Sequence, residues 1–132
     1  MKSIIKILAI FIPLVLASPL IQSSENYPQI EVTTTSGVFV IELDRNRAPK
    51  TVENFLNYLN DGFYKNTVFH RVIPGFVIQA GGFTVDLEEK ETLPEIINES
   101  GNGLTNQRMS IGMARTNEPH SASSQFYINL AD

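Results

Sequence analysis

The run from Phe69 to Thr84, FHRVIPGFVIQAGGFT, constrains the fold of this chain more than any other stretch. Two apolar, strand-like segments flank Pro74 and Gly75, a pair that favours a chain reversal, so the run predicts an antiparallel hairpin. The first segment also carries Arg71 among apolar neighbours. Because a guanidinium is always charged and is rarely kept within an apolar run without a purpose, Arg71 is a candidate functional residue.

The length of the turn decides which residue faces Arg71 across this hairpin. With a two-residue turn, Arg71 lies opposite Ile78 and shares its face with large apolar side chains. With Phe76 added to the loop, Arg71 instead lies opposite Gln79. We favour this second register because it keeps the charge away from the buried side. The inward face is then Val68, His70, Val72, Ile78 and Ala80, and we interpret His70 as a structural histidine.

Alternation with a period of two residues dominates the rest of the chain. The strand-like runs are Ile30 to Thr34, Val38 to Leu43, Val68 to Ile73, Val77 to Ala80, Glu95 to Asn98, Met109 to Met113 and Gln125 to Leu130. From Ala48 to Asn60 the apolar residues recur at helical spacing, with Pro49 in the first turn and Gly62 after the end, which predicts one amphipathic helix. Many short strands with one early helix favour a mostly β fold, a closed or nearly closed antiparallel barrel.

The composition is that of one ordinary globular domain. Of 132 residues, 42% are hydrophobic and 18% are charged, which is typical of a folded chain with a single core. The net charge of -4 argues against nucleic acid as a partner, because nucleic-acid-binding proteins usually carry a basic stripe. The chain has no cysteine and only two histidines, so we expect no disulfide, no metal and no cofactor. Asp86 to Glu91 is interpreted as a solvated loop and His120 as an exposed side chain.

The first residues predict export from the cytoplasm. Lys2 and Lys6 precede the apolar run from Ile7 to Ala17, the pattern of a secretory signal peptide over residues 1–17. The run is shorter than the roughly 20 apolar residues of a membrane span, and Pro13 interrupts it, so a permanent transmembrane helix is the weaker interpretation. An uncleaved signal that tethers the protein to the membrane is the alternative. Residues 18–28 are then a polar tether, and the folded domain covers residues 29–132.

Three separated blocks of the sequence closely resemble the cyclophilins, the peptidyl-prolyl cis-trans isomerases. They are the run from Phe69 to Thr84, the stretch from Gly112 to Arg115, and the stretch from Ser124 to Asn129. The resemblance extends from about Ile30 to the last residue and is closest to the bacterial periplasmic branch. It implies an antiparallel barrel of eight strands capped by two helices, with a peptide groove on its outer face.

The reaction of that family rotates the peptide bond before proline and breaks no bond. A catalyst must therefore prefer the twisted amide, whose nitrogen has become a hydrogen-bond acceptor, and the fixed, permanently protonated fork of Arg71 suits this task. No nucleophile and no cofactor is needed. By resemblance, Arg71, Gln79 and Phe76 are catalytic, and the substrate-binding residues are Met113, Ala114, Arg115, Gln125 and Tyr127. The family commonly has phenylalanine where Tyr127 stands, and the added hydroxyl requires a partner or solvent.

The sequence stops at Asp132, directly after a strand, where cyclophilins continue with further strands and a second helix. We therefore expect a partial domain that lacks its closing strands and second helix and that folds poorly in isolation. Three hypotheses follow. The chain is a monomeric isomerase acting on unfolded or flexible polypeptides with Xaa-Pro bonds, a proline-peptide-binding module without turnover, or an inactive truncated product.

Overall fold

The computed structural model describes residues 24–132, so the predicted signal peptide and the first part of the tether lie outside the described residues. The elements are β1 (Gln29–Thr34), β2 (Gly37–Glu42), α1 (Pro49–Asn60), β3 (Arg71–Ile73), β4 (Val77–Ala80), β5 (Ile111–Met113) and β6 (Phe126–Asn129). This is the mostly β architecture with an early helix that the sequence predicts. Within residues 24–132, no helix has both the length and the apolar character needed to cross a membrane.

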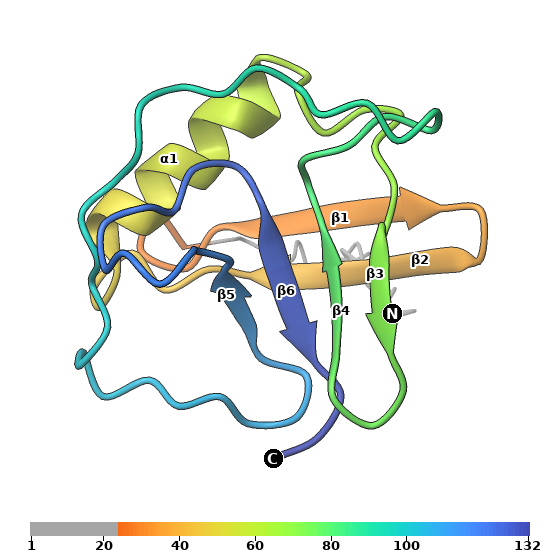
Figure 1. Ribbon diagram of the computed structural model, residues 1–132. Coiled ribbons are helices and arrows are strands. Elements are labelled where there is room, and N and C mark those ends of the chain that lie inside the picture. The colour runs from red at the N-terminus through yellow and green to blue at the C-terminus, as the bar shows by residue number, and fades with distance from the viewer. Residues whose placement is uncertain (1–23) are drawn as a thin grey trace, which may run out of the picture.

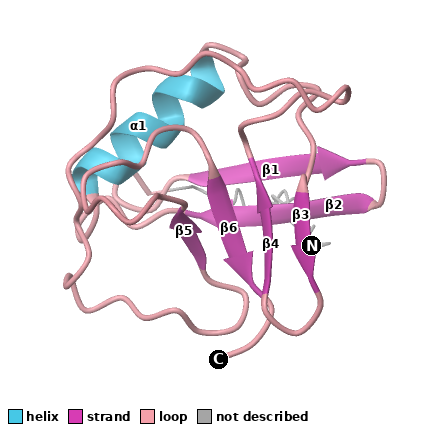
Figure 2. Cartoon of the chain, in the orientation of Figure 1, coloured by secondary structure: helices cyan, strands magenta, loops and turns pink. Residues whose placement is uncertain are grey.

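The strands form two antiparallel sheets. β1 pairs with β2, and the second sheet has the order β3-β4-β6-β5. In Figure 1 the β1–β2 pair runs behind the four-stranded sheet, and α1 lies above that sheet (Figures 1 and 2). Within the described residues no strand pairing joins the two sheets, so the expected closed barrel is open here. β3 and β5 are consequently edge strands, and β3 carries Arg71 on a solvent-accessible edge.

The core lies where α1 meets the two sheets. Its buried members are Ile30, Ile41, Leu43, Val52, Phe55, Ala80 and Phe126. The ring of Phe55 on α1 meets the ring of Phe126 on β6 edge to face, with 5.5 Å between their centres, and Tyr64 packs against both. The Tyr64 hydroxyl donates to the Ser124 carbonyl at 2.9 Å, and burial raises the pKa of Tyr64 well above its ordinary value. This aromatic cluster holds β6, the strand that carries Tyr127, against the helix.

The start of α1 is capped by a residue from a distant loop. Ala48, at the N-cap position, has no side chain that could accept a hydrogen bond from the first turn. The Glu99 carboxylate accepts instead from the Thr51 amide at 2.6 Å, the Thr51 hydroxyl at 2.8 Å and the Lys50 amide at 3.2 Å. A carboxylate at this end of a helix also interacts favourably with the helix dipole. Glu99 thereby fixes the long connection between β4 and β5 to the helix.

The hairpin of β3 and β4 has the register that the sequence analysis favoured. Arg71 pairs with Gln79, and the loop contains Phe76. The Phe76 amide donates to the Ile73 carbonyl at 3.0 Å, and Gly75 has a φ of 72°. A backbone with positive φ at this position after proline is a type II turn, which only glycine enters without strain. The turn therefore sets the pairing that brings the guanidinium opposite an amide.

Three predicted strands are shorter or weaker than expected, and one of them is β3, which begins at Arg71 and not at Val68. Residues 95–98 form no strand, and only an isolated bridge joins Ile96 to Ala122. The prediction was wrong because the neighbouring segment is a loop, so the apolar residues have no second strand to pair with. Met109 has a φ of 68°, which no strand residue adopts, and β5 begins at Ile111. The apolar pattern alone did not reveal this break.

Two residues of this hairpin that were predicted to face inward, His70 and Val72, are not fully buried. His70 is half-buried, and its ring centre lies 4.5 Å from that of Phe83. Its Nδ1 atom is buried without a hydrogen-bond partner. Burial is the main cause that lowers the pKa of His70, and the nearby charge of Arg71 also lowers it. Val72, which was predicted to face inward, is 58% exposed because β3 is the edge strand of its sheet.

Candidate functional site

Four residues from four strands form one row across the second sheet. Arg71 pairs with Gln79, Gln79 with Tyr127, and Tyr127 with Gly112. Directly opposed residues of neighbouring strands share a face, so the row lies on one side of the sheet. Arg71 is exposed, and its Nη1 donates to Gln79 Oε1 at 3.1 Å. The Gln79 amide donates in turn to Gln125 Oε1 at 2.9 Å. This bond directs the Gln79 amide oxygen toward Arg71.

The charge of Arg71 is balanced only weakly within the protein. In residues 24–132 the ion pairs join Arg47 to Asp44 and Lys50 to Glu53, and none involves Arg71. Its one side-chain bond goes to the neutral amide oxygen of Gln79. A guanidinium has five N–H donors, so most of them remain available to a ligand. The arrangement holds a cation in place without neutralising it.

The phenol end of Tyr127 lies over its neighbour Gly112 in β5. A Cβ atom on Gly112 would stand 2.6 Å from the Tyr127 hydroxyl oxygen and 2.7 Å from the adjacent ring carbon. The hydroxyl donates to Asn106 Oδ1 at 3.1 Å, so of the two possibilities that the sequence analysis left open, a partner or solvent, the structure has a partner. The sequence analysis did not identify Asn106 itself. The phenolic hydroxyl was the only signal, because the partner lies 21 residues away in a loop.

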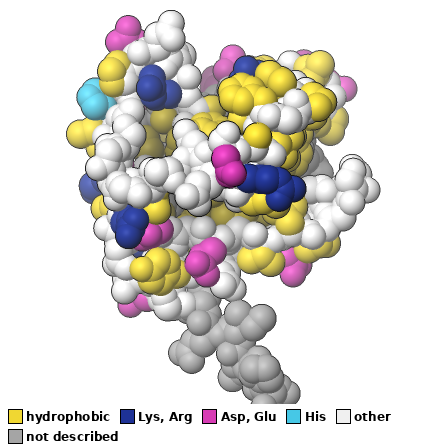
Figure 3. Space-filling model, turned by 90° about the horizontal axis from the view of Figure 1, so that it is seen from below, with side chains coloured by type: hydrophobic (Ala, Val, Ile, Leu, Met, Phe, Trp, Pro, Cys, Tyr) yellow, Lys and Arg dark blue, Asp and Glu magenta, His cyan; other side chains and the backbone are white. Residues whose placement is uncertain are grey.

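Phe76 lies at the tip of the β3–β4 turn and is 54% exposed. Its carbonyl accepts from the Leu130 amide at 2.8 Å, which ties the turn to the end of β6. Seen from below, hydrophobic side chains gather on one side of the face that includes this turn (Figure 3). An exposed aromatic ring at the tip of the hairpin that carries Arg71 is a surface that an apolar ligand group can cover.

Met113 was assigned to the proline socket, and the structure places it elsewhere. It pairs with Phe126, one position along from Gly112, so its side chain is on the opposite face of the sheet. There it packs, partly buried, against the core. Val77 lies instead on the face of Gln79 and is only 5% exposed. The sequence analysis did not name Val77, although its spacing of two positions from Gln79 in β4 places both on one face of the sheet.

The remaining predicted residues surround the β5–β6 edge. The Ala114 amide donates to the Gln125 carbonyl at 2.9 Å and extends the pairing of the two strands. The Arg115 guanidinium donates to the Thr116 carbonyl at 2.9 Å and is therefore directed at its own loop. The Gln125 side chain crosses Gly82, where a Cβ atom would lie 2.6 Å from it. Ala114 and Gln125 are thus brought to the row, whereas the Arg115 side chain is not.

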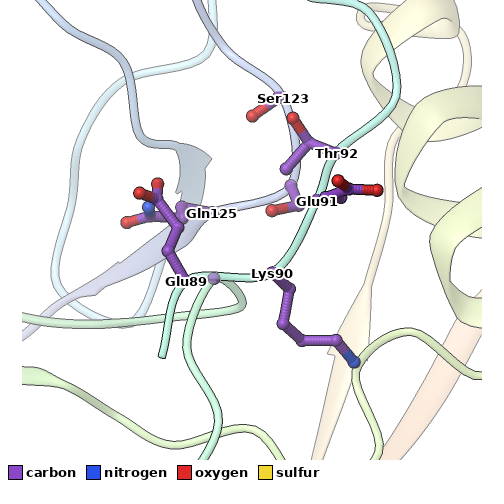
Figure 4. A pocket seen from close by; sticks show the side chains of 8 residues that line it. Glu89, Lys90, Glu91, Thr92, Ser123 and Gln125 are labelled. Carbon is purple, nitrogen blue, oxygen red and sulfur yellow. The ribbon is translucent and has the colours of Figure 1, made fainter. Parts of the chain in front are cut away.

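A cavity of about 320 Å³ lies beside Gln125. Gly82, residues 89–92 and residues 123–125 line it. In Figure 4 the Glu89 side chain extends toward Gln125, and the Lys90 side chain points away from it. The Lys90 ammonium bonds the Phe63 carbonyl and lies 4.4 Å from the centre of the Phe63 ring. Lys90 is therefore half-buried, while the rest of the predicted solvated loop at residues 86–91 is exposed.

No histidine belongs to the row. His120 is exposed as predicted, and its Nδ1 accepts from the Asn98 amide at 3.0 Å, which links two loops. Among residues 24–132 there is no group of three or more histidine, cysteine or acidic side chains placed to hold a metal ion. What the site offers a ligand is a fixed guanidinium, two amide side chains and an exposed aromatic surface.

The family described as Cyclophilin type peptidyl-prolyl cis-trans isomerase/CLD matches residues 29–132. The chain therefore belongs to the cyclophilin family. The matched range is the predicted folded domain, and it includes every residue of the row.

Several curated relatives are bacterial isomerases. The chain is 54% identical over 103 residues to a peptidyl-prolyl cis-trans isomerase of Streptomyces antibioticus, covering 78% of this chain and 62% of that protein. It is 52% identical over 99 residues to Peptidyl-prolyl cis-trans isomerase B of Escherichia coli, covering 75% of this chain and 60% of that protein. The chain thus spans less than two thirds of the length of these relatives.

Solved structures share the fold. A cyclophilin type peptidyl-prolyl cis-trans isomerase of Cryptosporidium parvum has a TM-score of 0.68 at 28% identity, covering 80% of this chain and 68% of that chain. A second structure of that protein, in the presence of the dipeptide Ala-Pro, has a TM-score of 0.64 at 30% identity, covering 76% of this chain and 66% of that chain. The open sheets described above are therefore arranged as in a cyclophilin.

Proposed function

We propose that this chain accelerates the cis/trans exchange of Xaa-Pro bonds in unfolded or flexible polypeptides, without a covalent intermediate. The observation that carries the proposal is the exposure and fixed position of the Arg71 side chain. It is exposed, it is held at 3.1 Å by the neutral amide of Gln79, and it lies in one row with Tyr127. A charged donor is thereby fixed beside an aromatic surface of a size that suits a proline ring.

The chemistry requires only a donor that prefers the twisted amide. Rotation about the peptide bond loses amide resonance, which sets a barrier of about 18 to 20 kcal/mol. At the midpoint the nitrogen of the imide regains a lone pair and can accept a hydrogen bond, which the planar ground state cannot do. A donor placed at this nitrogen therefore stabilises the transition state more than the substrate. Because the Arg71 guanidinium stays protonated, it donates at every physiological pH.

The neighbouring residues take roles that follow from their positions. Phe76 and Tyr127 hold the proline ring, and Val77 lies on the same face of the sheet. Gln79 orients Arg71 and meets the carbonyl before proline. Ala114, Arg115 and Gln125 hold the substrate backbone, and the cavity beside Gln125 receives a substrate side chain.

The required stabilisation is within reach of one such donor and the binding of the ring. Uncatalysed exchange takes tens to hundreds of seconds, and a gain of about 10⁴ corresponds to about 5.5 kcal/mol. Removing one preorganised donor from an enzyme typically costs about 2.7 to 4 kcal/mol. Arg71 is exposed in the free protein, so the seated proline itself must exclude water from the guanidinium.

A protease-coupled isomerisation assay on the purified protein tests the proposal. We expect Arg71→Ala to lower kcat/KM by about 10² to 10³, and Arg71→Lys to restore little of it because an ammonium lacks the planar fork. Arg45→Ala, which removes a guanidinium outside the row, serves as the control. Equal rates for the wild type and Arg71→Ala would refute the proposal. Tight binding of a proline peptide without turnover would select a binding module, and neither binding nor turnover would select an inactive product.

We also infer that the protein acts in the periplasm as a monomer, exported by residues 1–17. The support is the pair of lysines before a short apolar run in the sequence. Cell fractionation followed by N-terminal sequencing tests this inference. A mature protein that begins near residue 18 supports it, and an uncleaved protein in the membrane fraction selects the tethered alternative.

A further inference from the structure

The Tyr127 side chain is held by two contacts, one to Gly112 inside the row and one to Asn106 outside it. Beneath it, Gly112 has no side chain, and the phenol lies where a Cβ atom would stand. At its far end the hydroxyl donates to Asn106 Oδ1 at 3.1 Å. Because the phenol end lies over Gly112 and its hydroxyl bonds Asn106, the ring has little freedom to turn, although it is only half-buried.

Asn106 is exposed, but its side chain is anchored to the sheet through a buried residue. Its Oδ1 also receives the Asn129 amide at 3.4 Å, and the same amide nitrogen donates to Ser110 Oγ at 2.9 Å. Asn129 is 6% exposed and belongs to β6, two positions after Tyr127. The Met109 amide donates to the Asn129 carbonyl at 2.7 Å and fixes the loop that carries Asn106. Asn106 is thereby a fixed acceptor and not a mobile surface side chain.

An immobile ring matters for a site that must bind a small apolar ring. A side chain that is ordered only when the ligand arrives loses rotational freedom at that moment, which weakens binding. Because Gly112 and Asn106 already restrict the Tyr127 ring, binding of the proline causes no further loss of rotational freedom there. A phenylalanine in this position would have no hydroxyl to hold, so the contact to Asn106 depends on the tyrosine.

We propose that Asn106 is a positioning residue that fixes Tyr127 as a preformed wall of the proline socket and so determines how tightly Xaa-Pro peptides bind. The inference rests on the function proposed above. Asn106 acts through Tyr127 and makes no contact with the rotating bond, so its loss affects KM and leaves kcat unchanged. Arg71 provides the contrast, because its loss lowers kcat.

The experiment is a double-mutant cycle on residues 106 and 127. We expect Asn106→Ala and Tyr127→Phe each to raise KM by about three- to tenfold, the usual factor for immobilising one side chain. The double variant should match the single variants because both break the same bond. Asn106→Asp keeps an oxygen at the acceptor position and should retain most of the affinity. Asn117→Ala, an exposed asparagine in another loop, is the matched control.

The affinity of a proline peptide, measured by NMR titration, separates this inference from the proposed function. If the wild type binds the peptide but does not turn it over, the isomerase proposal fails while the cycle can still be read from the dissociation constants. An unchanged KM and dissociation constant in Asn106→Ala overturns the inference. Effects of the two single variants that multiply in the double variant, or an absence of peptide binding in the wild type, overturn it as well.

Discussion

The row of site residues and the long connection between β4 and β5 are held in place by different means. The row takes one residue from each of four strands, and the pairing of β3, β4, β6 and β5 sets the position of each. The connection at residues 81–110 is attached at separate points by side-chain hydrogen bonds and isolated bridges. Glu99 reaches α1, the Leu93 amide donates to the Tyr58 hydroxyl at 2.8 Å, and Asn98 donates to His120.

The comparison shows which residues of the molecule are held in fixed positions relative to one another. A strand pairing supports each residue through its neighbours, so the positions of the guanidinium, the amide and the ring depend on one another. A loop that is attached at separate points can lose one of these contacts and keep the others. We therefore expect substitutions in the row to affect both activity and stability. In the connection, apart from Asn106, which bonds Tyr127 of the row, we expect substitutions to affect stability alone.

The largest effect should come from Gly112→Ala in the row. The added Cβ atom would lie 2.6 Å from the Tyr127 hydroxyl oxygen, so the ring must tilt and release Asn106. We expect a loss of about 1 to 3 kcal/mol in the free energy of unfolding, as for other overpacked sites, together with a clear rise in KM. Urea denaturation and the isomerisation assay measure the two effects.

Gly82→Ala is the matched control for that substitution. There the new Cβ atom meets the flexible side chain of Gln125, which can move away. We expect less than about 1 kcal/mol of lost stability, because a movable side chain relieves the overlap. Equal stability losses in the two variants would contradict the view that the ring over Gly112 is clamped.

A smaller effect should come from Glu99→Ala in the connection. This change removes the acceptor for the Lys50 and Thr51 amides at the start of α1. A lost helix cap costs about 0.5 to 2 kcal/mol, which urea denaturation can measure, while kcat/KM should stay unchanged. Glu95→Ala makes the same change of charge at an exposed position of the same connection and should leave stability unchanged. A fall in kcat/KM for Glu99→Ala would show that the cap also supports the row.

The smallest expected effect is a dependence of stability on pH that comes from His70, the residue directly before β3. Burial lowers the pKa of His70, so the unfolded chain binds this proton more readily than the folded protein. Stability should therefore fall as the pH drops through about 6.5, the ordinary value for histidine, and the fall should end below the folded pKa. In His70→Gln this part of the pH dependence should disappear. Urea denaturation of both proteins between pH about 7.5 and about 5 covers the window.

The parts of the site that local chemistry determines were predictable from the sequence. The Pro74-Gly75 turn, with Phe76 in the loop, was enough to place Arg71 opposite Gln79, because the alternative would have put a charge on the apolar side. The hydroxyl of Tyr127 was enough to predict that it needs a partner or solvent, and in the structure it bonds Asn106. In both cases the evidence lay within a few residues, or in the chemistry of one side chain.

The rest depends on contacts between segments that are distant in the sequence. Nothing near Glu99 indicates that it caps a helix 48 residues earlier, and nothing near Asn106 indicates a tyrosine 21 residues later. Met113 was misplaced for a related reason, because resemblance identifies a position but not the face of the strand on which it lies. The strand predicted at residues 95–98 was wrong because an apolar run needs a partner strand, which the local sequence cannot reveal.

The cap on α1 also has a consequence for how the protein is made. Glu99 follows Thr51 by 48 residues, so the helix emerges from the ribosome well before its acceptor has been translated. At a synthesis rate of roughly 5 to 20 residues per second, the delay is roughly 2 to 10 seconds. Throughout that interval the first turn of the nascent helix has unpaired amides and frays. A chaperone that meets the nascent chain early encounters a helix whose beginning has yet to form.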